Sequence, residues 1–208
     1  VFDFNVVSRY QKGWLVLSEK DNSSVLSYSH EVSDKEIDVT FVDVYNSLYG
    51  AGQLGTKPLS LGRHYSDQAD QILVVQEGEG GSVELDGTNF EKVITTDKEF
   101  VDGAYPTGFS PIKAEYGERI EIVVGKDGRV YSRIRASSIF QSTRYNNTPI
   151  SNAKITQTYY KNRLPYILMY DEQNHRIMAI QDIPQSNTGK ILYAKQDALG
   201  GNAPEFTD

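Results

Sequence analysis

Four segments of this 208-residue chain repeat one pattern, in which an apolar run leads through a polar turn into a second run that begins with Val or Ile. The second runs begin at Val25, Val83, Val130 and Ile177, so successive units are 58, 47 and 47 residues apart. A period of about 40–50 residues that contains β-hairpins is typical of the blades of a β-propeller. The four segments are Trp14–Tyr28, Ile72–Leu85, Ile120–Ile134 and Tyr166–Ile180.

The residues between the paired runs favour hairpin turns. Asp127-Gly128 stands where a two-residue turn needs positive φ, and Asp21–Ser24 and Glu77–Gly81 are expected to form longer versions of the same turn. The first run of each pair is nearly all apolar, as in a strand covered on both faces, so we expect Trp14 in the core. Thr96 is expected to cap one helical turn. Further strands are expected at Asp38–Tyr45, Asn89–Thr95 and Lys190–Ala194, and Val42–Leu48 is read as strand from its Val and Tyr content.

These signals predict an all-β, propeller-like array of about four repeated antiparallel blades. Residues 1–208 form a single all-β repeat region in this interpretation, because the four units follow one another along the chain. Helix signals are weak throughout. Since closed propellers have about 4–8 blades, we expect part of a larger or incomplete propeller. A β-sandwich made of four unrelated hairpins is the alternative fold. Val1 and the linker-like Ala198–Phe206 lead us to expect a fragment of a longer chain. The units are expected at approximately 5–62, 63–110, 111–157 and 158–200.

Composition and motifs argue against several functions. The net charge of −7 repels phosphate backbones, so we expect no nucleic acid partner. The absence of Cys excludes disulfides and thiol catalysis, and His30, His64 and His175 lack metal-ligand spacing, so we expect no metal and no cofactor. The Gly50–Gly55 stretch matches a dinucleotide-loop pattern, but loop and strand residues follow it instead of a helix. The apolar runs are too short to cross a bilayer.

Four short phrases stand out along the chain, namely Gly13–Glu19, Phe41–Asn46, Ile72–Gln76 and Gly81–Asp86. Taken together they resemble the PKD-like family lipoproteins of gut Bacteroidetes, and the resemblance covers roughly residues 5–195. In such proteins a lipidated N-terminus and an immunoglobulin-like domain precede a repeat-rich β region, which is the part this chain resembles. The resemblance implies a location at the cell surface or outer membrane, a lipid anchor outside this chain as its link to the membrane, and neighbours devoted to nutrient uptake. It transfers no catalytic residues.

Aromatic residues in polar loops are the candidate binding groups, because flat rings stack on the apolar faces of sugars. The predicted ligand-binding residues are Tyr105, Phe109, Arg144, Tyr145 and Asn146. We therefore expect a non-catalytic cell-surface module, not an enzyme, that binds glycan or partner proteins of an uptake system. Open sheet edges also make self-association an expected property. Two alternatives remain, namely a purely structural spacer and a propeller glycosidase or lyase fragment. The latter would use carboxylates such as Asp43, Asp86, Asp102 and Glu115.

Overall fold

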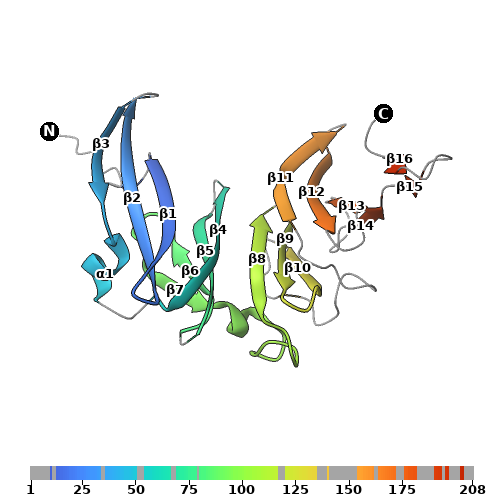
Figure 1. Cartoon of the computed structure of the whole chain (residues 1–208), viewed down its shortest axis with the longest axis horizontal. Helices are drawn as coiled ribbons and strands as arrows, with labels where there is room; N and C mark the ends of the chain where they lie inside the picture. Colours follow the sequence, from blue (N-terminus) through green and yellow to red (C-terminus); the bar gives the residue numbers. More distant parts are fainter. Residues whose placement is uncertain are drawn as a thin grey trace, which may run out of the picture. The chain divides into compact units, whose positions relative to one another are not determined.

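The structure is a computed structural model in which antiparallel β-sheets dominate (Figure 1). The chain divides into two compact units, Val1–Thr96 and Asp97–Asp208, called here the first and the second unit. No helix among the described residues is long and apolar enough to cross a membrane. The described residues are 10, 13–33, 36–50, 54–66, 69–78, 80–116, 120–134, 140, 154–161, 164–171, 176–181, 190–193, 195–196 and 202–203.

The first unit contains two sheets whose strands follow chain order. The first sheet is β1 (Gly13–Lys20), β2 (Ser23–Ser33) and β3 (Glu36–Phe41). After the short helix α1 (Val44–Tyr49), the second sheet is β4 (Thr56–Ser66), β5 (Ala69–Glu77), β6 (Val83–Asp86) and β7 (Lys92–Thr95). The single turn expected at Thr96 is present as the 3-10 helix η1 (Thr96–Glu99).

The turn between β1 and β2 is tighter than the sequence predicted. Asp21 and Asn22 alone connect the strands, and both have positive φ, 51° and 62°. Two consecutive residues of positive φ match the right-handed twist of the flanking strands, and Asn and Asp tolerate this conformation best after Gly. The expected longer turn over Asp21–Ser24 is therefore wrong, because Ser23 and Ser24 already pair within the sheet.

Helix α1 replaces the strand that was predicted over Val42–Leu48. Asp43 adopts a left-handed φ of 54°, which turns the chain away from β3. The Asn46 side chain then donates to Asp43 Oδ2 at 2.8 Å, and the Ser47 hydroxyl donates to the Asp43 carbonyl oxygen at 2.9 Å. The helix buries Val44 and Tyr45 in the core of the first unit. That core also contains Leu26, Tyr28, Leu54, Ile72, Val74, Val83, Leu85 and Phe90.

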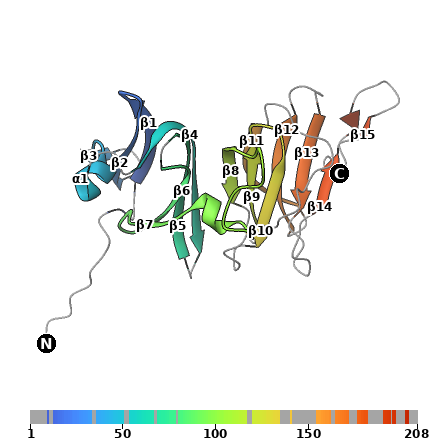
Figure 2. The ribbon, with the colours of Figure 1, turned by 90° about the horizontal axis from the view of Figure 1, so that it is seen from below.

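The second unit repeats the meander arrangement. One sheet is β8 (Pro111–Tyr116), β9 (Ile120–Gly125) and β10 (Val130–Ile134). The other is β11 (Lys154–Lys161), β12 (Leu164–Asp171), β13 (Arg176–Gln181) and β14 (Lys190–Tyr193), which lie side by side in Figure 2. The short strands β15 (Lys195–Gln196) and β16 (Asn202–Ala203) pair with each other. The core joins both larger sheets through Ile122, Val124, Val130, Ile167, Met169, Met178 and Ile180.

The prediction of an antiparallel all-β chain with little helix is confirmed. In the Asp127-Gly128 turn, however, Gly128 alone has positive φ (75°), and its N–H donates to the Gly125 carbonyl oxygen at 2.9 Å.

The placement of Trp14 in the core is wrong, because its side chain is 63% exposed on β1. The blade interpretation and its four unit boundaries remain predictions.

Candidate functional site

Phe109, one of the predicted ligand-binding residues, belongs to an aromatic cluster in the second unit. Its ring lies 4.8 Å from Tyr131 and 5.7 Å from Phe100, centroid to centroid, and the residue is only 6% exposed. Tyr105 is half-buried and packs edge-on against Phe100 at 5.5 Å. Tyr105 and Phe109 also pack against each other, with ring centroids 5.8 Å apart, but neighbouring rings cover Phe109. A sugar ring cannot stack on a covered aromatic face.

The other three predicted ligand-binding residues, Arg144, Tyr145 and Asn146, lie outside the described residues. Their role therefore remains a prediction, as does that of the half-buried Tyr105.

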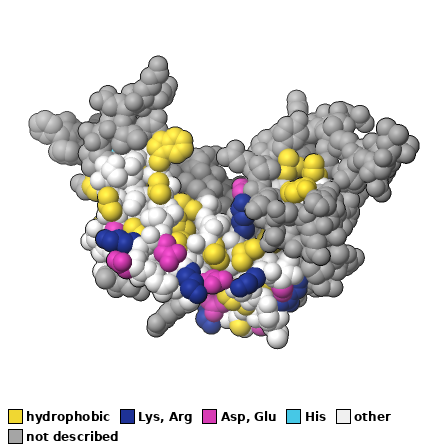
Figure 3. Space-filling model, viewed as in Figure 1, with side chains coloured by type: hydrophobic (Ala, Val, Ile, Leu, Met, Phe, Trp, Pro, Cys, Tyr) yellow, Lys and Arg dark blue, Asp and Glu magenta, His cyan; other side chains and the backbone are white. Residues whose placement is uncertain are grey.

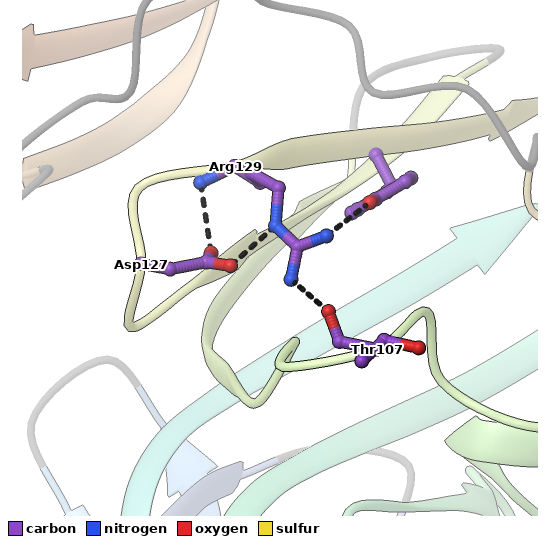
Figure 4. A network of polar contacts seen from close by, with 4 residues as sticks. Thr107, Asp127 and Arg129 are labelled. Carbon is purple, nitrogen blue, oxygen red and sulfur yellow. Dashed lines mark hydrogen bonds and ion pairs between the residues drawn. The ribbon is translucent and has the colours of Figure 1, made fainter.

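An arginine network holds the loop of Phe109 against the β9–β10 hairpin (Figure 4). The Arg129 guanidinium donates to the Thr107 carbonyl oxygen at 2.8 Å, to the Tyr131 hydroxyl at 3.2 Å and to Asp127 Oδ2. The backbone N–H of Arg129 donates to Asp127 Oδ1 at 3.1 Å. The Arg129 guanidinium carbon also lies 5.8 Å from the Phe109 ring centre, within cation–π range. These contacts give the loop a structural role.

Two buried carboxylates of the second unit share one arginine. The Arg133 guanidinium donates through Nε to Glu121 and through a terminal nitrogen to Glu99, and all three side chains are buried. Its carbon also lies 4.8 Å from the centre of the Phe140 ring. In a glycosidase the two carboxyl groups flank a sugar instead of a guanidinium. This arrangement is therefore that of a structural ion cluster.

The carboxylates named for the glycosidase alternative lie in turns or on a strand. Asp43 stands at the start of α1, Asp102 is exposed in a turn, and Glu115 is half-buried on β8. Asp86 Oδ1 accepts hydrogen bonds from the Thr88 backbone at 2.8 Å and from its hydroxyl. Burial raises the pKa of Asp86, but these bonds and one from Asn89 outweigh it, so the pKa lies below its ordinary value. Among the described residues, no cluster of three or more His, Asp and Glu side chains could hold a metal ion.

The first unit carries a groove between β1 and β4 that sequence reasoning missed. It has a volume of about 640 Å³, which falls within the range of ligand pockets. Leu15, Leu17 and Leu61 form its floor, because these half-buried side chains also pack on the core. Its rims carry Val16 and Leu59, which are 51% and 43% exposed. The remaining lining residues are Ser18, Glu19, Pro58 and Ser60.

The exposed apolar surface continues along β1 beyond the groove. Side chains alternate between the two faces of a strand, so Trp14 and Val16 share the outward face of β1. Figure 3 shows hydrophobic side chains exposed over this strand. Trp14 and Val16 together therefore form a small exposed apolar surface beside the groove.

The two strands that border the groove are both sheet edges. In the part of the chain that the structure describes, β1 pairs with β2 alone and β4 pairs with β5 alone. β1 is regular over eight consecutive residue pairs, from Gly13 opposite His30 to Lys20 opposite Ser23. Because alternate residues of an edge strand turn their N–H and C=O groups outward, β1 presents hydrogen-bonding groups for another strand.

The β4 edge is much less suited to pairing. Its register shifts twice between Thr56 and Ser60, Lys57 has a positive φ of 49°, and Pro58 has no N–H to donate. Bulges and proline are the features that natural sheets use to block their edges. The groove therefore has one edge able to pair, β1, and one apolar wall, β4.

Comparisons with known proteins give little further information. No family model matches the chain, and no curated protein matches it. Among solved structures, the crystal structure of BamB from Moraxella catarrhalis is similar with a TM-score of 0.44 and 11% sequence identity. That match covers 94% of this chain, which spans 55% of the BamB chain.

Proposed function

We propose that this chain is a non-catalytic binding module that holds an extended segment of a partner protein in the groove between β1 and β4. The regular edge of β1, which pairs with β2 alone among the described residues, lies beside an apolar hollow and carries this proposal. An added strand gains main-chain hydrogen bonds along the edge and buries alternate side chains in the neighbouring groove.

The apolar rims supply the expected binding energy. Val16 and Leu59 are about half exposed in the free chain, so covering them contributes about 1 kcal/mol each. Replacing both with Gln removes about 2 kcal/mol, which weakens binding about 30-fold. Val93 on β7 is the matched control, because it is 56% exposed on another edge strand of the first unit and lies outside the groove lining.

The test is a selection of peptides from a random display library against the full chain, followed by amide NMR with a selected peptide. We expect slowed hydrogen exchange at alternate amides of β1. Binding should weaken in the Val16→Gln, Leu59→Gln double variant and remain unchanged in Val93→Gln. A selected peptide that binds the double variant as tightly as the unmodified chain would show that the groove is not the site.

The same proposal includes a propeller-like arrangement and a cell-surface location. Each main sheet is a meander of three or four strands in chain order, the strand order expected within a propeller blade. The resemblance to PKD-like lipoproteins supports a role beside outer-membrane uptake proteins. An experimental structure that shows one two-sheet sandwich would refute the propeller, and fractionation of the source cell tests the location.

Glycan binding is the second candidate, and the exposed Trp14 indole favours it. Flat, accessible aromatic rings stack on sugar faces, and Trp offers the largest such ring. A glycan array with the full chain and its Trp14→Ala variant tests this candidate. Glycan signals that vanish in the variant would favour sugar recognition over peptide capture.

A further inference from the structure

The charge of the chain is concentrated in the first unit. Residues 1–96 contain 15 Asp and Glu against 7 Lys and Arg, a net charge of −8. Residues 97–208 contain 13 against 14, a net charge of +1. The unit that carries the groove therefore accounts for the acidity of the whole chain.

The charged side chain that lines the groove is negative, like the net charge of the first unit. Glu19, exposed near the end of β1, is the charged residue among those that the structure describes as lining the groove. The nearby Lys57 lies 3.9 Å from Glu77 on β5, so an acidic partner already offsets its positive charge. A segment that enters the groove therefore meets an apolar floor and one negative side chain, that of Glu19.

We propose that the segment captured by β1 is cationic and amphipathic, with apolar residues alternating with Lys or Arg. This inference rests on the proposed function and adds the chemical class of the partner. In an added strand the apolar side chains would cover the groove and the basic ones would face the solvent, where the field of the first unit attracts them. A second copy of this chain is disfavoured as the occupant, because two first units of charge −8 repel each other.

Long-range attraction of this kind acts mainly on the association rate. Opposite net charges steer the encounter of two molecules, and salt screens the effect over about 8 Å at physiological ionic strength. Once the strand is paired, hydrogen bonds and apolar contacts with β1 hold it, and these depend little on salt. A cationic segment should therefore associate fast at low salt and lose that advantage as salt rises.

The experiment uses three synthetic eight-residue peptides, matched to the length of β1, in which Val alternates with Lys, Glu or Thr. Their binding to the full chain is measured by stopped-flow fluorescence between about 0.05 M and about 0.5 M salt. We expect the Lys peptide to associate at least about tenfold faster than the Glu peptide at low salt, with the Thr peptide between them. The difference should shrink at high salt.

Two charge variants separate the contribution of Glu19 to peptide binding from that of the net charge of the first unit. Glu19→Lys removes the negative side chain from the groove, whereas Glu91→Lys makes the same change in net charge at another exposed position of the first unit. Glu19→Lys should lower the affinity for the Lys peptide more than Glu91→Lys does.

The outcomes distinguish the two proposals. Equal binding of all three peptides at β1, whatever the salt, would overturn the cationic partner and leave strand capture intact. Failure of every peptide to bind would overturn strand capture itself. A concentration-dependent dimer that buries β1 would instead identify a second copy as the occupant and overturn the cationic partner.

Discussion

Replacing Arg133 with Met should strongly destabilise the second unit. Met keeps much of the length and apolar volume of the arginine stem but removes the guanidinium that pairs with Glu99 and Glu121. All three side chains are buried, so water cannot take over the role of the lost partner. The substitution leaves two carboxylates in a low-dielectric interior without their shared cation.

The expected loss in the free energy of unfolding is about 3–5 kcal/mol, the usual cost of breaking a buried ion pair from one side. The contact with the Phe140 ring, 4.8 Å from the guanidinium carbon, contributes up to about 2 kcal/mol within that range. Arg133→Lys should also destabilise, because a single ammonium cannot reproduce the planar fork that reaches both carboxylates. A triple variant, Arg133→Met with Glu99→Gln and Glu121→Gln, should recover most of the loss.

Hydrogen exchange measured by mass spectrometry across a urea series gives the free energy of unfolding of each unit. Peptides from β9 and β10 report the second unit, and peptides from β5 and β6 report the first, which serves as an internal control. A loss of less than about 1 kcal/mol in Arg133→Met would show that the ion cluster contributes little to stability. A triple variant as unstable as the single one would show that lost packing, and not the unpaired buried carboxylates, causes the destabilisation.

Four smaller perturbations test other parts of the structure. Phe109→Ala should lower the stability of the second unit by about 3–5 kcal/mol, since it removes a buried ring that packs on Phe100 and Tyr131. Asn22→Ala should cost the first unit about 1 kcal/mol, because Ala tolerates positive φ poorly; urea unfolding measures both effects. The folded state lowers the pKa of Asp86, so its ionised carboxylate stabilises the fold at pH values above its ordinary pKa of 3.8. This stabilisation is lost as the pH falls through the lowered pKa. The stability advantage over Asp86→Asn should therefore shrink in acid. Burial, and then the charges of Glu91 and Asp86, raise the pKa of Tyr49. The neutral Tyr49 hydroxyl therefore contributes fully to stability at pH values below its ordinary pKa of 10.0, and this contribution is lost as the pH rises through the raised pKa. When the free energy of unfolding is measured against pH, the stability advantage of the unmodified chain over Tyr49→Phe should narrow in alkali.

The hairpins could be predicted from sequence because their signals are local. An apolar run, a turn residue suited to positive φ and a second run lie within about 15 residues of each other. The strand pairs β1–β2, β5–β6, β9–β10 and β12–β13 all occur at the predicted segments. The length of the turn between β1 and β2 was harder to predict, because Asp21-Asn22 is a less common pair than Asp-Gly in a tight two-residue turn.

Helix α1 and the buried Phe109 depend on contacts far apart in the sequence. α1 has six residues, too few to be stable alone, and it is held by burying Val44 and Tyr45 against strands on either side of it in the chain. Phe109 sits in a loop whose composition is polar, and that loop folds inward because Arg129 reaches the Thr107 carbonyl oxygen. Neither the burial of α1 nor the bond from Arg129 to the Thr107 carbonyl oxygen can be predicted from the composition of the segment concerned.

The groove was missed because a fully apolar run reveals neither how many faces of its strand are covered nor whether the strand lies at a sheet edge. Residues 14–17 were read as a strand covered on both faces, and Trp14 was assigned to the core on that basis. Only one face of β1 packs on the core, so Trp14 and Val16 face solvent while Leu15 and Leu17 pack inward. An edge strand that had only to remain soluble would carry charges or proline at the exposed positions, as β4 carries Pro58. β1 instead combines a regular edge with exposed apolar residues, and the peptide selection proposed above tests whether a partner strand covers them.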